Sequence, residues 1–448
     1  MKTSDLARKV KDLIKYPSLV YIAPLVLMSI YFRIRLAYSV YKLENGFPRT
    51  HDSYWYIDRA NELIQNFKIS PDFNGIFYIG YYGLLALILL IFKTEVVMVI
   101  LQVIINALSV LLVYRISEMV FSRRVAVIAS LIFVFSYEIK RWSVYILTDS
   151  IFISSLLLCI YFLLLFKESK LKKYLYLFTA SMVYMVFLRP AGVITAAFIV
   201  IYLLLSVDYK NLLRYLPKRP ILCGTAAVMT IFVSVFFIYK TINSSLGMSF
   251  YWHLRWLLHG SYSIGNIFDY PTPYNYKFNA VKDSNYLNNF VLSYFINNWY
   301  HILLLYIKRF IFFWGELWIW DYHFKNFQEV IQYLRKLAPI LLMIVGMVCS
   351  IRGRMIDKAL VLFVPIISVV LFCLIFFVDG AWRYRVPCLP YVEMFMAYGI
   401  DLGIVLVLRF VHRLGLDYYI RVAYEKVEPS IQKRIGWLYL IPSNEGKD

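Results

Sequence analysis

Residues 95–115, EVVMVILQVIINALSVLLVYR, carry charged side chains only at their two ends. A helix of this length and composition can cross the hydrocarbon core of a bilayer, which takes about 20 apolar residues. The same pattern recurs along the chain, in which 61% of the 448 residues are hydrophobic. Further apolar blocks lie near 17–38, 123–138, 148–166, 173–188, 190–207, 220–240, 335–351, 358–378 and 386–408. The sequence therefore predicts an all-α polytopic membrane protein.

The formal net charge of +20 reflects the loops between these blocks. Lys and Arg gather in the N-terminal segment, in the region after residue 408, and in loops at 115–124, 167–173, 210–219 and 352–358. Positive loops face the cytoplasm in membrane proteins. All of these loops can do so only if the further apolar block 76–92 does not span. We therefore expect that block to be re-entrant or to lie at the membrane surface. The positive charge does not indicate nucleic-acid binding, because the sequence contains no motif for nucleic acid.

The predicted topology is a bundle of about ten to eleven transmembrane helices with both ends in the cytoplasm. Residues 1–408 form this domain, and residues 409–448 form a basic cytoplasmic tail. Two long outer loops run from about 39–94 and 241–334. Within the second, residues 298–320 are apolar but contain charged side chains, which favours an amphipathic helix in the interface over a further span.

The first outer loop carries an acidic residue at the start of a helical pattern, HDSYWYIDRANEL (51–63). In a helix, Asp52, Tyr56 and Ala60 lie on one face, and Arg59 lies beside them. A carboxylate just above the bilayer could act as general base toward an acceptor hydroxyl. The competing interpretation is that Asp52 only caps the helix.

A second acid, Asp149, follows an outer loop in SVYILTDSIFISSLLL (143–158), where it could equally be a helix cap. Arg383 and Arg385 lie outside, immediately before the last span, and so depart from the positive-inside pattern. Arginine presents a planar fork that suits phosphate, although snorkelling at a helix end is the alternative. Arg189 lies at an outer turn fixed by Pro190, and a simple interfacial turn would also explain it.

Several familiar sites are missing from the sequence. It contains no P-loop, no glycine fingerprint for nucleotides and no HExxH pattern, and its histidines and cysteines have no metal-ligand spacing. We therefore expect no cofactor and no dedicated metal site, although metal dependence stays open. A sugar reaction on the outer face could not easily use a cytoplasmic nucleotide sugar.

The order of these motifs resembles the GT-C membrane glycosyltransferases, especially the protein O-mannosyltransferases and lipid A aminoarabinose transferases. The resemblance extends from residue 20 to about 408, and each motif alone is weak. The matching elements are Asp52 with Tyr56 and Ala60, NGIFYIGYYGLLALILLIF (74–92), TDSIF (148–152), FLRPAGV (187–193) and WRYRVPCLPY (382–391). Ser53 departs from those members that carry a second acid after the first.

The resemblance implies transfer of a sugar, with inversion, from a polyprenyl-phosphate carrier to an acceptor hydroxyl on a glycan, lipid or protein. The protein would be a multi-pass protein of the cytoplasmic (plasma) membrane with its active site outside. Asp52 and Asp149 are the expected catalytic residues, and Arg383, Arg385 and Tyr384 the expected ligands of the donor phosphate. The residues expected to bind substrate are His51, Tyr56, Arg59, Arg189, His253 and Arg255.

Two other functions remain open from the sequence. An O-antigen-type polymerase or ligase is also polytopic with a large outer loop, but the acid in the first outer loop argues against it. A lipid-linked-sugar transporter or flippase predicts inverted repeats and ionisable residues near mid-span. The apolar blocks show neither feature clearly.

Overall fold

The computed structural model describes residues 17–70, 72–206, 245–263, 265–267, 270–271, 286, 289–314, 326–353, 355–376 and 382–413. These residues are almost entirely helical, as predicted; the exception is one antiparallel pair of two-residue strands, β1 (Asn266–Ile267) and β2 (Tyr270–Pro271). The predicted span 220–240 and most of the tail 409–448 lie outside the described residues.

The helices up to residue 206 correspond closely to the predicted blocks. They are α2 (Pro17–Leu43), α3 (His51–Asn66), α4 (Phe73–Phe77), α5 (Ile79–Phe92), α6 (Val96–Val120), α7 (Arg123–Phe135), α8 (Tyr137–Arg141), η1 (Trp142–Val144), α9 (Asp149–Ser169), α10 (Lys172–Val186) and α11 (Pro190–Leu205). The later helices are α14 (Ser245–Leu257), η2 (Leu258–Tyr262), α15 (Phe290–Asn297), α16 (Trp299–Phe313), α17 (Phe327–Arg352), α18 (Ile356–Phe376), η4 (Trp382–Cys388) and α19 (Leu389–Arg413).

Within the described ranges, six helices are long and apolar enough to cross a membrane. They lie in α2, α6, α9, α17, α18 and α19. The predicted blocks at α7, α10 and α11 also form helices, but these have 13, 15 and 16 residues. A span needs about 20 residues, so within the described residues helix length alone identifies six spans, or seven if the bent pair α15 and α16 is one span.

Two apolar segments, for which the sequence did not decide whether they span the membrane, form short or bent helices. The block 76–92 contains α5, whose 14 residues give a length of about 21 Å and cannot cross a core of about 30 Å. This agrees with the prediction that the block does not span. The block 298–320 contains α16, which meets α15 at a bend of 82°; the pair could be one broken span or a re-entrant loop.

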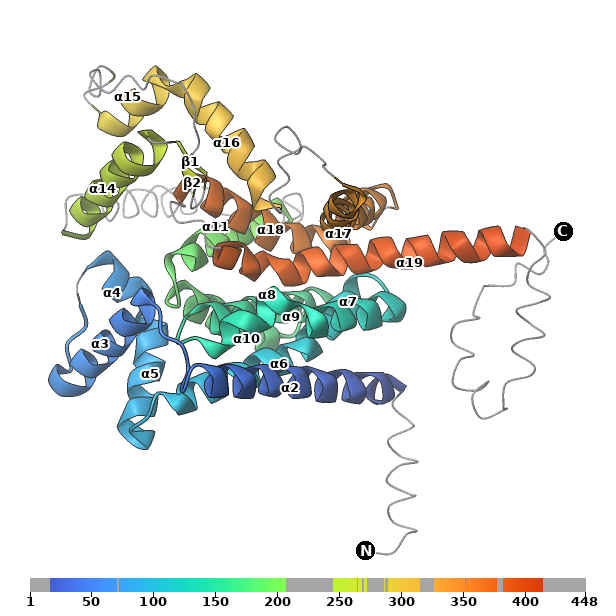
Figure 1. The fold of residues 1–448 in the computed structure, drawn as a ribbon, viewed down its shortest axis with the longest axis horizontal. Helices are drawn as coiled ribbons and strands as arrows, with labels where there is room; N and C mark the ends of the chain where they lie inside the picture. The colour runs from blue at the N-terminus through green and yellow to red at the C-terminus, as the bar shows by residue number, and fades with distance from the viewer. Residues whose placement is uncertain are drawn as a thin grey trace, which may run out of the picture.

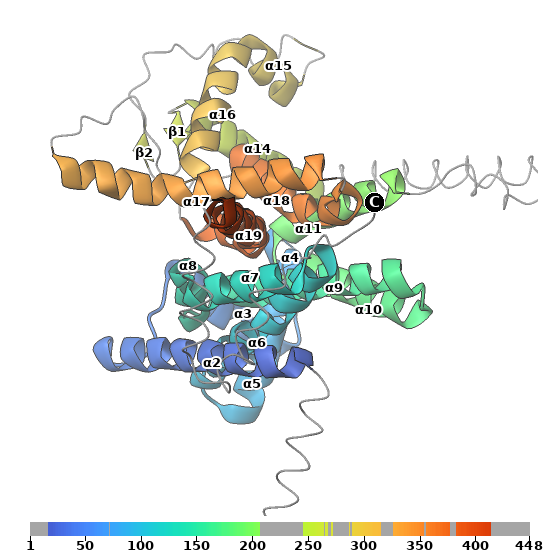
Figure 2. The ribbon, with the colours of Figure 1, turned by 90° about the vertical axis from the view of Figure 1, so that its right-hand side faces the viewer.

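The helices are stacked in layers. Figures 1 and 2 show α2 and α6 below α7 to α10, which in turn lie below α11 and α17 to α19, with α14 to α16 on top. The start of α2 and the end of α19 lie on the right of Figure 1, whereas α3 and α4 lie on the left. The helix that carries Asp52, α3, thus lies on the opposite side of the molecule from the start of α2 and the end of α19.

The contact between α2 and the inner helices is polar at one point. Arg33 of α2 is fully buried, and its guanidinium donates to Oδ1 of Asn106 at 2.5 Å and to Oγ of Ser29 at 2.8 Å. Ser29 in turn donates to the carbonyl of Ala107. A buried polar group is stable only when it is hydrogen-bonded, so these bonds fix the register of α2 against α6.

Helices α17 and α19 cross at two glycines. A β-carbon on Gly346 would overlap the carbonyl oxygen of Phe395, and one on Gly399 would overlap that of Leu342. Small residues at such a crossing let two backbones approach closely in a membrane. The crossing places α19, and therefore η4 before it, against the rest of the bundle.

We expect Gly346→Ala to destabilise the protein by about 1–3 kcal/mol, the usual cost of overpacking. The added methyl group would separate α17 from α19, and detergent unfolding should report the loss. Gly403→Ala is the matched control, because a β-carbon at Gly403 meets nothing within 4 Å. Equal stabilities for the two variants would mean that the close crossing does not contribute.

Candidate active site

Four charged side chains from four separate segments form one chain of ion pairs. Nη2 of Arg383 lies 2.7 Å from Oδ2 of Asp52, and Nη1 of Arg189 lies 2.6 Å from Oδ1 of Asp149. Nε of Arg383 completes the chain at 2.9 Å from Oδ2 of Asp149, in a contact that is not aligned as a hydrogen bond. The two acids and two arginines balance, so the cluster Asp52–Arg383–Asp149–Arg189 is electrically neutral.

Asp52 lies at the accessible end of this cluster. Its side chain is 42% exposed, whereas that of Arg383 is 9% exposed. Helix α3 is capped by Thr50, which exchanges hydrogen bonds with Ser53, so the interpretation of Asp52 as the helix cap is wrong. Asp52 instead lies in the first turn, where the helix dipole favours a carboxylate. Its carboxylate is therefore available to a substrate.

Asp149 lies at the closed end of the cluster. Its side chain is fully buried, and the side chain of Arg189 is 3% exposed. Asp149 begins α9 but does not cap it; the cap position belongs to Thr148, whose side chain makes no capping bond. Because the cluster fully encloses Asp149, this carboxylate is placed to hold the two arginines rather than to touch a substrate.

Aromatic rings surround the guanidinium groups. Tyr384 packs against both Arg189 and Arg383, with ring centroids 5.1 and 4.9 Å from the guanidinium carbons. Tyr56 is buried below Asp52 in an edge-to-face contact with Tyr81. Burial raises the pKa of the Tyr56 hydroxyl well above its ordinary value, which keeps this group neutral. The floor of the site is thus aromatic and uncharged.

A buried amide braces the segment that leads to Asp149. Nε2 of Gln102 on α6 donates to the carbonyl oxygens of Ser143 and Tyr145, at 3.3 and 2.7 Å. Its Oε1 accepts from the hydroxyl of Tyr81 on α5 at 2.7 Å. These bonds connect α5, α6 and the turn before α9, so Gln102 helps to position the segment that leads to Asp149.

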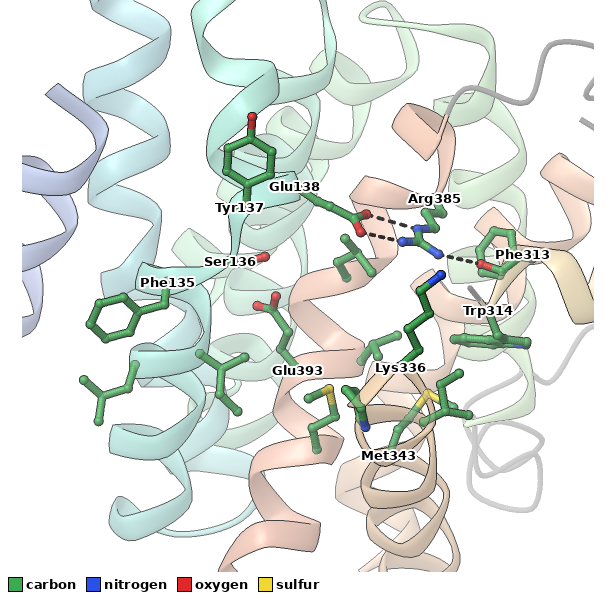
Figure 3. A pocket seen from close by; sticks show the side chains of 17 residues that line it. Phe135, Ser136, Tyr137, Glu138, Phe313, Trp314, Lys336, Met343, Arg385 and Glu393 are labelled. Carbon is green, nitrogen blue, oxygen red and sulfur yellow. Dashed lines mark hydrogen bonds and ion pairs between the residues drawn. The ribbon is translucent and has the colours of Figure 1, made fainter. Parts of the chain in front are cut away.

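Arg385 does not join the cluster. It lies two residues after Arg383 in the 3₁₀ helix η4, which has about three residues per turn, so the two side chains diverge. Its guanidinium binds the carboxylate of Glu138 on α8 at 3.1 and 2.5 Å and the carbonyl oxygen of Phe313 at 3.0 Å (Figure 3). Its predicted contact with a donor phosphate stays a prediction.

The other predicted substrate-binding residues are spread over two regions. His51 is exposed beside Asp52, and Arg59 forms an ion pair with Glu62 on the same helix. Arg255 on α14 packs against the rings of Trp252 and Phe290. His253 also belongs to α14. Among the described contacts, the side chains of His51, Arg59 and Arg255 have no ion pair with the cluster.

Several site residues were not found from the sequence. Gln102 had a usable signal, since a polar amide inside the apolar block 95–115 needs a partner. Glu138 had a weaker one, as an acid at the end of the apolar block 123–138, and Glu393 had one as an acid inside the block 386–408. In the part of the chain that the structure describes, no group of three or more His, Cys, Asp or Glu side chains could hold a metal ion.

The described helices define an all-α polytopic membrane protein, and the cluster with the half-exposed Asp52 is its candidate active site. Residues 79–244 match the family model described as dolichyl-phosphate-mannose-protein mannosyltransferase. The match includes Asp149 and Arg189 and supports a GT-C-like membrane glycosyltransferase. Asp52 and Arg383 lie outside the matched residues.

The other comparisons add less. The crystal structure of the apo oligosaccharyltransferase from Archaeoglobus fulgidus aligns with a TM-score of 0.47 at 14% identity. The alignment covers 92% of this chain and 54% of that protein, so the chain spans about half the length of the solved relative. No protein with a curated description matches the chain.

Proposed function

We propose that this protein transfers a sugar from a polyprenyl-phosphate carrier to an acceptor hydroxyl at the extracytoplasmic face of the plasma membrane, with inversion at the anomeric carbon. The acceptor is a glycan, lipid or protein of the cell envelope. One observation carries the proposal: a half-exposed carboxylate, Asp52, is held in place by a nearly buried arginine whose charge is balanced by a second, enclosed acid. The family match over residues 79–244 supports the reaction class.

In this proposal Asp52 is the catalytic base. Its Oδ2 is held by Arg383, which fixes the direction of the carboxylate before a substrate arrives. The acceptor hydroxyl approaches the exposed side of Asp52 and gives up its proton as its oxygen attacks the anomeric carbon. Such prealignment of reacting groups lowers the barrier by reducing the entropy that must be lost at reaction.

The bond from the anomeric carbon to the phosphate oxygen breaks in the same step, and the electron pair leaves with the lipid phosphate. Arg383 forms an ion pair with Asp52, and Tyr384 packs on its guanidinium. We assign to Arg383 the stabilisation of this developing charge, an effect that often dominates catalysis. Asp149 and Arg189 are positioning residues that hold Arg383, and α14 with His253 and Arg255 is the proposed acceptor wall.

A donor panel tests this proposal against the alternatives. Purified protein in nanodiscs should release free polyprenyl phosphate from polyprenyl-monophosphate sugars in the presence of acceptor extracts. We expect no product from nucleotide sugars or from pyrophosphate-linked sugars, and the glycoside formed should have the opposite anomeric configuration to the donor.

Three other results of the donor panel would contradict the proposal. Turnover of pyrophosphate-linked donors would favour the polymerase or ligase. Movement of an intact lipid-linked sugar across the bilayer, without release of polyprenyl phosphate, would favour the transporter. Product with a retained anomeric configuration would contradict a single displacement assisted by Asp52.

A further inference from the structure

Two acid–arginine pairs attach η4 to the segment that runs from α8 to the start of α9. Asp149, the first residue of α9, contacts Nε of Arg383. Earlier in the same segment, Glu138 binds the guanidinium of Arg385. Both arginines belong to η4, which packs against α8 and α9. The proposed mechanism uses the first pair, but it gives Glu138 no role.

The pair of Glu138 and Arg385 fixes both side chains. Nε and Nη2 of Arg385 donate to the two carboxylate oxygens of Glu138, and Nη1 donates to the carbonyl oxygen of Phe313 at 3.0 Å (Figure 3). Every nitrogen of the guanidinium therefore makes a hydrogen bond. A bidentate pair between arginine and a carboxylate fixes geometry more strictly than a single contact does. The side chain of Arg385 is only 15% exposed, so water has limited access to it.

The backbone that carries Glu138 is itself held in place. Glu138 lies in the first turn of α8, and the next residue, Ile139, is fully buried. The hydroxyl of Ser143 donates to the carbonyl oxygen of Lys140 at 2.7 Å, and Gln102 donates to the carbonyl oxygen of Ser143. Glu138 is therefore presented from a fixed segment, and its pair with Arg385 can hold η4.

The 3₁₀ conformation of η4 makes such an attachment important. Hydrogen bonds in a 3₁₀ helix have poorer geometry than those in an α-helix, and residues two apart differ by about two thirds of a turn. On one side of η4, Asp52 and Asp149 hold Arg383. On another side, Glu138 holds Arg385. Loss of this second attachment leaves η4 free to turn about its axis, and the cavity of about 890 Å³ lined by both members of the pair provides room for the movement.

We infer that Glu138 is a positioning residue of the candidate active site: its pair with Arg385 fixes η4 and so sets the direction of Arg383. The inference rests on the proposed function, in which Arg383 stabilises the charge of the departing lipid phosphate. A misplacement of about 1 Å can lower the rate of a catalysed reaction by about 10²-fold. Because this stabilisation is strongest in the transition state, a change in the direction of Arg383 should reduce kcat more than it weakens donor binding.

A double-mutant cycle of Glu138→Gln and Arg385→Gln tests the inference by release of polyprenyl phosphate from a polyprenyl-monophosphate sugar. We expect each single variant to lower kcat by about tenfold, with KM for the donor within about twofold of the wild type. Because Glu138 acts through Arg385, the double variant should be no slower than Arg385→Gln alone. Losses that multiply to about 100-fold in the double variant would overturn the inference.

Glu118→Gln is the matched control, because Glu118 also forms partly exposed pairs with arginines, on the opposite side of the sequence from η4. Its kcat should stay within about twofold of the wild type. Direct contact of Arg385 with the donor phosphate would give a different pattern. Arg385→Gln would then raise KM for the donor, whereas Glu138→Gln would lower it by releasing the arginine to the phosphate. That pattern would overturn the positioning role.

Hydrogen exchange without donor gives a readout that does not depend on sugar transfer. In Glu138→Gln, the amides of residues 382–388 should exchange about fivefold faster than in the wild type, while those of α3 should be unchanged. Equal exchange of η4 in the two proteins would overturn the inference even if the wild type transfers sugar. Faster exchange of η4, in a protein whose wild type turns over no donor, would contradict the proposed function and support the attachment of η4 by Glu138.

Discussion

Asp52→Asn is expected to lower kcat for sugar transfer by about 10²–10⁴-fold, the range that a general base contributes. Asparagine keeps the shape of the side chain and can still accept a hydrogen bond from Arg383, but it cannot take the proton of the acceptor hydroxyl. Binding of the donor should change little, because its lipid and phosphate do not depend on that proton transfer. Initial rates of polyprenyl phosphate release, at saturating donor, measure the effect.

Asp58→Asn is the matched control for this experiment. Asp58 lies on the same helix α3 and is exposed, but it is not part of the ion-pair cluster. Its replacement should leave kcat within about twofold of the wild type, since surface changes away from a site are near neutral. Full activity in Asp52→Asn, in a folded protein, would remove Asp52 from the mechanism and leave it as a partner of Arg383 alone.

Asp149→Asn is expected to destabilise the fold by about 3–5 kcal/mol, because it removes one member of a buried ion pair. Arg189 and Arg383 would lose the carboxylate that both contact, and Arg189 would have no other described acid beside it. Unfolding in mixed detergent micelles, followed by circular dichroism, measures the loss. Activity should fall as well, since Arg383 would no longer be fixed.

A double variant distinguishes the cost of an unpaired buried charge from other destabilising effects of the substitution. Asp149→Leu combined with Arg189→Met removes both charges of the enclosed pair and should recover part of the stability lost by either change alone, because paired charges can be replaced by apolar groups at little cost. Glu118→Gln breaks a more exposed pair and should cost at most about 1 kcal/mol. A similar loss in Asp149→Asn and Glu118→Gln would contradict the assignment of a tightly held buried pair.

The membrane character of the fold could be predicted from the sequence because a long apolar block in lipid is stable as a helix. Blocks 95–115 and 148–166 became the helices α6 and α9 within a few residues. The number of full spans could not be predicted so well. α7 and α10 are mostly apolar but have only 13 and 15 residues, and hydropathy does not reveal where a helix ends within an apolar block.

The four members of the ion-pair cluster could be singled out from the sequence one by one, but their arrangement could not, and their roles stay predictions. Asp52, Asp149, Arg189 and Arg383 were all selected from outer loops, and the structure brings them together. Their pairing depends on tertiary contacts between distant segments, which no local pattern encodes. The separation of Arg383 from Arg385 was also not predicted, because it depends on η4 being a 3₁₀ helix rather than an ordinary loop. The competing interpretation of Asp52 as a helix cap is wrong, because Thr50 is the cap residue and exchanges hydrogen bonds with Ser53.

The distance along the chain between the cluster members has a consequence for biosynthesis. Arg383 is made 331 residues after Asp52, which takes roughly 17–66 s at ordinary rates of translation. Asp149 and Arg189 are only 40 residues apart, so the nascent chain can pair them as soon as α9 to α11 have inserted. Asp52 is paired only after η4, which carries Arg383, has been made. A ribosome that stalls before η4 therefore leaves a membrane-inserted chain whose acids are not fully neutralised, a difference that cellular quality control can detect.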